Sequence, residues 1–243
     1  MSQLDNVKNR RAPIKLSGLL NKDTFKAWDY FLIIGFTSIS IIISCVKGNF
    51  ETLSFVGGLF GILCVIFGAK GNILNFAFGL IGSAISGYIA LKTGLYAYAA
   101  LFFLYNVPMQ FFGFSQWRKR VLKNHVSAIK TRWMTWPQRI LLLIFSPAGV
   151  VGLGFLLKQT DDPQPFMDAT VTTVMVVAQF VLTFAFIEQW FMWIIVNVTT
   201  ISIWAIATAR GEQYAAIMMV QSFFYLINSL YGVFQWSKLA KSE

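Results

Sequence analysis

Charged residues are scarce in this sequence. Asp, Glu, Lys and Arg make up 12% of its 243 residues, about half the fraction found in an ordinary soluble domain. Hydrophobic residues make up 56%, and a soluble chain of that composition would expose more apolar surface than water tolerates. The composition therefore excludes an ordinary soluble domain and predicts an all-α integral membrane protein, because helices satisfy their own backbone groups in lipid.

Metal ligands and nucleophiles are equally scarce. His125 is the single histidine and lies in a basic linker, and the two cysteines, Cys45 and Cys64, lie in apolar runs. A thiol in such a run behaves mainly as a small hydrophobic group. We therefore expect no disulfide, no metal site and no cofactor. The sequence also lacks a catalytic pair and a phosphate-cradling glycine loop, so we do not expect an enzyme.

Acidic residues are half as frequent as basic ones, at 10 against 20. A basic surplus can indicate nucleic-acid binding, but here the basic residues gather in an N-terminal arm, 1–29, and in a linker, 118–139, both beside hydrophobic runs. This distribution follows the positive-inside rule. It predicts a multi-pass protein of the inner (plasma) membrane with both termini in the cytoplasm, and it argues against a nucleic-acid partner.

Eight hydrophobic runs are long enough to cross a bilayer, and they predict eight transmembrane helices. The apolar stretch 169–208 would be about 60 Å long as one helix, so it must fold back, and Glu188 and Gln189 mark the turn. Pro108 favours a kink in the fourth helix. The predicted spans are 30–46, 53–69, 73–91, 95–117, 140–157, 169–187, 190–208 and 214–236.

An internal repeat is visible at the ends of the fourth and eighth spans. Gly113-Phe114-Ser115-Gln116-Trp117 and Gly232-Val233-Phe234-Gln235-Trp236 share glycine, glutamine and tryptophan at the same spacing. A stretch beginning at Asn75 aligns with one beginning at Trp190. The pattern predicts two parallel three-helix repeats with a connecting helix between them, as in SWEET-type transporters. The alternative is that tryptophan and lysine only mark helix ends at the membrane interface.

This repeat gives the predicted organisation of the whole chain. An extra transmembrane helix precedes a core of three, one and three helices. The expected segments are the basic cytoplasmic arm 1–29, the extra helix 30–47, the first three-helix repeat 53–117, the basic cytoplasmic linker 118–139, the connecting helix 140–157 and the second three-helix repeat 168–238.

The spans carry amides and aromatic rings at helical spacing, and no charged residue lies deep in any of them. Coupling to protons commonly uses a carboxylate or histidine inside the membrane, so we do not expect it. The amides and rings predict an uncharged polar pocket for a flat ring with at most a delocalised positive charge, although each amide could instead hydrogen-bond only between helices. The candidate residues are Asn106, Gln110, Gln179, Trp190, Trp193, Asn197, Asn228 and Tyr231.

One motif resembles a known family. The pattern Glu188-x-Trp190-x-x-Trp193-x-x-x-Asn197, with Phe78-Gly79-Leu80-Ile81 and the Gly-x-x-x-Trp helix ends, is similar to the PnuC-type nicotinamide riboside transporters over residues 53–238. Trp190, Trp193 and Asn197 match the family motif directly, Gln110 occupies an amide position in the fourth span, and the pattern in the eighth span is looser.

The resemblance implies a SWEET-like fold, a homotrimer, and facilitated diffusion of nicotinamide riboside without ion coupling. It also implies that a cytoplasmic kinase phosphorylates the riboside and so traps it. Two alternatives remain open from the residues alone. One is a carrier for another neutral or cationic vitamin such as thiamine, and the other is a membrane scaffold that transports nothing.

Overall fold

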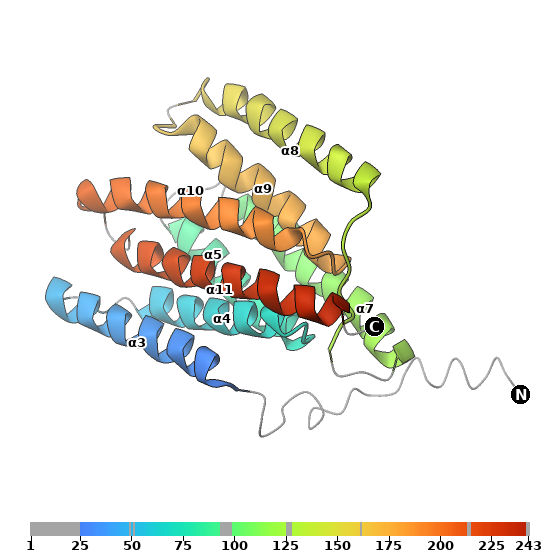
Figure 1. Ribbon diagram of the computed structural model, residues 1–243. Helices are drawn as coiled ribbons and strands as arrows, with labels where there is room; N and C mark the ends of the chain where they lie inside the picture. The colour runs from blue at the N-terminus through green and yellow to red at the C-terminus, as the bar shows by residue number, and fades with distance from the viewer. Residues whose placement is uncertain are drawn as a thin grey trace, which may run out of the picture.

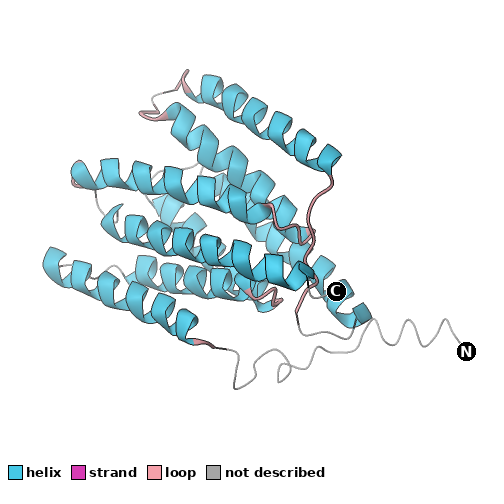
Figure 2. Cartoon of the chain, viewed as in Figure 1, coloured by secondary structure: helices cyan, strands magenta, loops and turns pink. Residues whose placement is uncertain are grey.

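The computed structural model describes residues 25–48, 50, 52–92, 99–124, 128–160, 162–212 and 215–241. In these residues the chain is helical, and the only β structure is an isolated bridge between Arg132 and Phe186 (Figures 1 and 2). The elements are α3 (Ala27–Lys47), α4 (Thr52–Ala69), α5 (Leu74–Lys92), η1 (Leu101–Asn106), α7 (Val107–Asn124), α8 (Trp136–Leu157), α9 (Pro165–Thr183), α10 (Gln189–Ala209) and α11 (Ala215–Lys241).

The predicted all-helical class is confirmed. Because η1 runs directly into α7, the described chain holds eight helices, one for each predicted span. Six of them are long and apolar enough to cross a membrane, namely α3, α4, α8, α9, α10 and α11, and α5 contains a shorter apolar stretch, Leu74–Ile89. The predicted turn between the sixth and seventh spans is present between Thr183 and Gln189.

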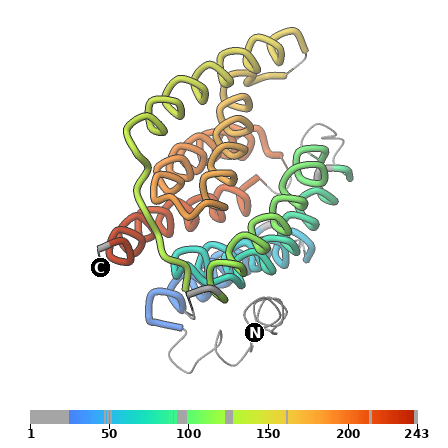
Figure 3. The backbone as a smooth tube through the Cα atoms, turned by 90° about the vertical axis from the view of Figure 1, so that its right-hand side faces the viewer, coloured from blue at the N-terminus to red at the C-terminus, as the bar shows by residue number. Residues whose placement is uncertain are grey.

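Six helices pack into a closed ring. Around it, α4 packs on α5, α5 on η1 and α7, α7 on α9, α9 on α10, α10 on α11, and α11 on α4. The other two helices lie outside the ring. The first, α3, packs against α4 and α11, whereas α8 packs on α9 and stands apart from the rest of the bundle (Figure 3).

The fourth helix is irregular next to Pro108, as predicted. The stretch Leu101–Asn106 is π-helical, and the backbone N–H of Val107 donates to the carbonyl of Phe102, five residues earlier. Pro108 has no N–H to continue the regular ladder, and π-helical turns of this kind often occur at functional sites. The helix then continues past Trp117, its predicted end, to Asn124, because Lys and Arg are good helix formers in water even where the apolar run has ended.

Two tryptophans make matched contacts at one end of the ring. The indole Nε1 of Trp117, in α7, donates to the carbonyl of Thr183 at the end of α9 over 3.1 Å. The Nε1 of Trp236, in α11, donates to the carbonyl of Gly68 at the end of α4 over 3.0 Å. Each bond joins the third helix of one predicted repeat to the first helix of the other.

The aromatic partners of these tryptophans correct the predicted alignment of the repeats. Phe76 meets Trp117 edge-on at 4.9 Å between ring centroids, and Trp190 meets Trp236 edge-on at 5.7 Å. Phe76, rather than Asn75, therefore takes the place that Trp190 has in the other half. The sequence favours the other register because it pairs two aromatic residues, Phe76 with Phe191 and Phe78 with Trp193, instead of one.

The linker crosses the same end of the ring, which we call the linker end. Its residues 128–135, which we call the strap, hydrogen-bond to both halves of the ring. The N–H of Ile129 donates to the carbonyl of Gly71 in the α4–α5 turn. The N–H of Arg132 donates to the carbonyl of Ala185 in the α9–α10 turn, and the carbonyl of Arg132 accepts from the N–H of Ile187. The strap therefore connects the α4–α5 turn to the α9–α10 turn at the linker end.

Candidate functional site

The ring encloses a cavity of about 210 Å³. All six ring helices contribute to its wall, and no residue of α3 or α8 does. Among its lining residues are Gly57, Gly61, Cys64 and Gly68 from α4, Asn75, Gly79, Ser83 and Ser86 from α5, Phe102, Asn106 and Gln110 from η1 and α7, Met175 and Gln179 from α9, Gln189, Trp190, Trp193, Asn197, Thr200 and Trp204 from α10, and Met218, Gln221, Tyr225 and Ser229 from α11.

Glycines on α4 and α5 make room for polar side chains from the neighbouring helices of the ring, α11 and α7. A Cβ at Gly79 would lie 2.7 Å from Oε1 of Gln110, and a Cβ at Gly61 would collide with the hydroxyl of Tyr225. These glycines are required for the space they leave and not for an unusual backbone angle. The amide and phenol groups therefore reach inward against bare helix backbone.

The α10 wall carries the predicted aromatic motif. Trp190, Trp193 and Asn197 all line the cavity, and Thr200 and Trp204 extend the same face toward the other end of the ring. Asn197 is 4% exposed, and its Nδ2 donates to the hydroxyl of Ser229 over 3.1 Å. The i, i+3 and i+7 spacing thus places two indoles and one amide side by side.

Three further predicted amides, from η1, α7 and α9, complete this part of the wall. Asn106 and Gln110 line the cavity from the irregular fourth helix, and Asn106 makes a long 3.7 Å contact with the sulfur of Met175. Gln179 lines it from α9. Six of the eight candidate residues therefore meet at one cavity.

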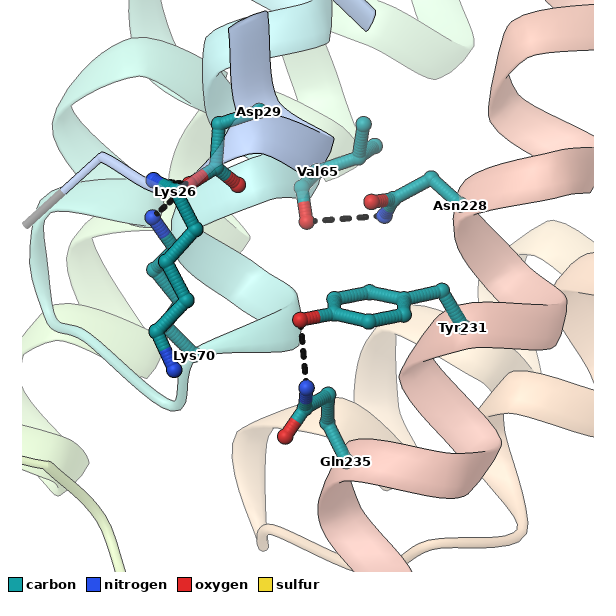
Figure 4. A network of polar contacts seen from close by, with 7 residues as sticks. All are labelled: Lys26, Asp29, Val65, Lys70, Asn228, Tyr231 and Gln235. Atoms are coloured by element: carbon teal, nitrogen blue, oxygen red, sulfur yellow. Dashed lines mark hydrogen bonds and ion pairs between the residues drawn. The ribbon is translucent and has the colours of Figure 1, made fainter. Parts of the chain in front are cut away.

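Asn228 and Tyr231 do not line the cavity. Figure 4 shows Asn228 beside Val65 and Tyr231 beside Gln235. The Nδ2 of Asn228 donates to the carbonyl of Val65 over 2.9 Å, which ties α11 to α4. Tyr231 accepts a hydrogen bond from Gln235 and stacks on Trp28 of α3 at 4.9 Å between ring centroids. Both residues hold helices together on the α3 side of the ring.

A buried ion pair lies near these two residues (Figure 4). The Nζ of Lys70, at the end of α4, lies 2.5 Å from Oδ2 of Asp29 at the start of α3, and Asp29 is 1% exposed. The same carboxylate caps α3 by accepting from the backbone N–H of Lys26. The pair fixes the beginning of the extra helix against the ring, well outside the cavity.

Several lining residues were not among the predicted ones. Gln221, Tyr225 and Ser229 occur at i, i+4 and i+8 along α11 and form one polar stripe, so helical spacing alone could have identified them. Gln189 was predicted to lie at the membrane interface, yet it is 0% exposed and lines the cavity. Asn75 is 2% exposed and also lines the cavity.

No charged side chain lines the cavity among the residues that the structure describes. Charged side chains lie at the two ends of the bundle instead. At the linker end, Glu188 accepts hydrogen bonds from the N–H of Met134 over 3.0 Å and from Nε of Arg139 over 2.8 Å. Burial and the charge of Arg132 lower the pKa of Arg120, whose guanidinium donates to the carbonyl of Phe184 over 2.9 Å. His125 lies outside the described residues.

The sequence matches one family of transporters. A model of the nicotinamide mononucleotide transporter family matches residues 51–238. The chain belongs to this family. A nicotinamide riboside transporter PnuC from Neisseria mucosa is 30% identical to it over 97% of this chain and 91% of that protein. A second PnuC, from Haemophilus influenzae, is 27% identical over 93% of this chain and 98% of that protein.

The fold agrees with this membership. The crystal structure of the vitamin B3 transporter PnuC covers 93% of this chain and 97% of its own, with a TM-score of 0.78 and 30% sequence identity. The resemblance to PnuC-type transporters is thereby confirmed, and the chain is a multi-pass membrane transporter of this family.

Proposed function

We propose that the protein carries nicotinamide riboside across the membrane by facilitated diffusion. The observation that supports this most is the uncharged cavity walled by indoles and amides. Nicotinamide riboside has a flat cationic ring, a carboxamide and ribose hydroxyls. The indole faces of Trp190 and Trp193 suit such a ring, because aromatic faces attract cations by roughly 0.5 to 2 kcal/mol without a buried anion.

The riboside fits this cavity better than the mononucleotide after which the family model is named. A phosphate would bring about two negative charges, and proteins usually bind phosphate with Arg or Lys. No such residue lines the cavity in the described part of the chain. The two relatives are named for the riboside, which agrees with this choice.

Transport without ion coupling is part of the proposal. A buried carboxylate or histidine would support proton coupling, whereas the lining here is neutral. Net uptake then requires that the riboside be removed inside the cell, and phosphorylation by a cytoplasmic kinase would do this because the product no longer fits the site. Assembly as a homotrimer in the inner membrane, with both termini in the cytoplasm, completes the proposal.

We further infer that the ring is built from two parallel repeats, α4–α7 and α9–α11, joined by α8 in the SWEET-like manner. The matched bonds of Trp117 to Thr183 and of Trp236 to Gly68 support this. Two halves with the same orientation around one central cavity also suit a carrier that exposes its site to either side in turn.

The first prediction tests transport directly. Purified protein in liposomes should exchange labelled nicotinamide riboside without a proton or sodium gradient, and protonophores should not change the rate. A strict requirement for either gradient would contradict uniport. Unlabelled thiamine and nicotinamide mononucleotide should compete poorly, and effective competition by thiamine would favour the alternative vitamin carrier.

A ligand screen separates a carrier from a scaffold. Nicotinamide riboside at 100 times its dissociation constant should stabilise the folded protein by about 2.7 kcal/mol. A scaffold whose amides only pack helices would gain no stability from any compound in a panel of vitamins and nucleosides.

A further inference from the structure

Unpaired polar atoms gather at the linker end of the cavity. In the described residues, ten buried side-chain N and O atoms have no hydrogen-bond partner. Five of these belong to residues that line this end of the cavity. They are Oδ1 of Asn75, Nε2 of Gln179, Nε1 of Trp190, and both Oε1 and Nε2 of Gln189. Buried polar groups are normally paired, so such a cluster in one cavity points to a ligand that pairs with them.

Gln189 is the centre of this cluster because its whole amide group is unpaired. It is the first residue of α10 and is 0% exposed. The preceding residue, Glu188, is held by Met134 of the strap and by Arg139 in the first turn of α8. These contacts fix the start of α10 and therefore the direction in which Gln189 points.

The chemistry of the cluster matches one kind of ligand group. A glutamine amide offers hydrogen-bond donors and an acceptor together, and a second carboxamide satisfies both. Asn75 adds an acceptor, and Gln179 and Trp190 add donors. A carboxylate on the ligand could use only the donors and would bring a negative charge that nothing in the described lining neutralises.

The cavity wall next to this cluster can hold the flat ring of a ligand. Asn75 and Trp190 approach Gly68 together, since a Cβ there would lie 3.9 Å from Nδ2 of Asn75 and 3.9 Å from the ring of Trp190. Trp193 lies one helical turn further from the linker end. A ring packed on these indoles would present a carboxamide substituent to Gln189.

The other end of the cavity suits the sugar. Ser86, Thr200 and Ser222 line it, and the hydroxyls of Thr200 and Ser222 already donate to carbonyls of their own helices, of Val196 and Met218. Their oxygens remain able to accept hydrogen bonds from ribose hydroxyls.

We propose that Gln189, assisted by Asn75, binds the carboxamide on the substrate ring and so determines specificity for it. This inference rests on the proposed function. It assigns the carboxamide to the linker end of the cavity and the ribose to the opposite end.

A two-by-two binding experiment tests the assignment. The wild type and Gln189→Met are each titrated by calorimetry with nicotinamide riboside and with the ribosyl pyridinium that lacks the carboxamide. Methionine has a similar length and no amide. We expect Gln189→Met to weaken binding of the riboside at least tenfold and to leave binding of the ribosyl pyridinium within about twofold. The difference between the two effects measures the interaction of Gln189 with the carboxamide.

Two controls make each outcome decisive. Gln159→Met, at an exposed turn after α8, should bind both ligands as the wild type does. Should Gln189→Met fail to fold, Asn75→Ser is taken through the same cycle and should show the same selective loss. Equal losses for both ligands, or no loss, would overturn the assignment, whereas a wild type that binds neither ligand would overturn the proposed function itself.

Discussion

At the scale of single residues, one glycine of the repeated helix end makes room for the tryptophan that walls the cavity. Gly232 lies against Trp190, and a Cβ there would come within 2.5 Å of two indole carbons. Gly113 lies in the same way against the ring of Phe76. The glycine of the repeated motif is thus a packing requirement, because the ring occupies the volume that a side chain would need.

Gly232→Ala should therefore disturb both packing and binding. The methyl group must displace the indole of Trp190, and overpacking of this kind costs about 1 to 3 kcal/mol of unfolding free energy. Thermal unfolding in detergent measures this loss. The control is Gly152→Ala in α8, where a Cβ meets nothing within 4 Å and alanine should stabilise the helix by about 0.5 to 1 kcal/mol. Similar effects of the two substitutions would contradict the packing role.

Most of the candidate site could be predicted from residue spacing, and its exceptions have physical reasons. The i, i+3, i+7 pattern predicts that Trp190, Trp193 and Asn197 share one helix face, and all three line the cavity. Spacing shows which residues share a face but not which neighbour that face meets, so Asn228 was grouped with the pocket although it bonds to α4. Gln189 was placed at the membrane interface because the acidic residue before it suggested contact with water, whereas Glu188 is hydrogen-bonded by Met134 of the strap and Gln189 lines the cavity.

At the scale of elements, the strap makes the hydrogen bonds that water would otherwise make to backbone groups at the linker end. The α9–α10 turn would leave backbone groups unpaired in the membrane interface, and the strap pairs with them through Arg132. Glu188 is 9% exposed and receives a backbone N–H and the guanidinium of Arg139. The turn and the strap therefore form one hydrogen-bonded unit.

Removal of the Glu188 carboxylate should loosen this unit. Glu188→Ala should lower the unfolding free energy by about 1.5 to 3 kcal/mol, as expected for hydrogen bonds to a charged group. The effect should fall short of that for a fully buried ion pair, because the side chain of Arg139 is 31% exposed. Chemical unfolding in detergent gives the value. Glu212→Ala, in the exposed turn before α11, should change stability by less than about 0.5 kcal/mol, and an equal loss there would contradict the role of the strap.

At the scale of the whole molecule, hydropathy was enough to find the helices but not their neighbours. Each predicted span contains or overlaps a helix, because a bilayer requires apolar runs of a narrow length range. The ring order depends on contacts between distant residues, such as those of Trp117 with α9 and of Trp236 with α4. The Asp29–Lys70 ion pair could not be predicted either. The sequence assigns Asp29 to the cytoplasmic arm, and only the packing of α3 on α4 brings it close to Lys70.

The distribution of basic residues predicts the orientation of the bundle. The start of α3 and the end of α11 lie at the same end as the strap (Figure 1). Of the twenty basic residues, sixteen belong to the arm, Lys70, the linker and the C-terminal tail, and the remaining four are Lys47, Lys92, Lys158 and Arg210. Basic segments beside membrane helices are retained in the cytoplasm, so the linker end should face the cytoplasm.

Cysteine labelling in a background without Cys45 and Cys64 tests this orientation. Lys130→Cys lies in the exposed part of the strap, and Thr160→Cys lies in the exposed turn after α8 at the opposite end. A membrane-impermeant maleimide should label Thr160→Cys in intact cells and Lys130→Cys only in inside-out vesicles. The reverse pattern would place the linker outside the cell. Gln189 and the proposed carboxamide subsite would then lie at the outer end of the cavity. Riboside leaving the cavity at that end would not meet a cytoplasmic kinase.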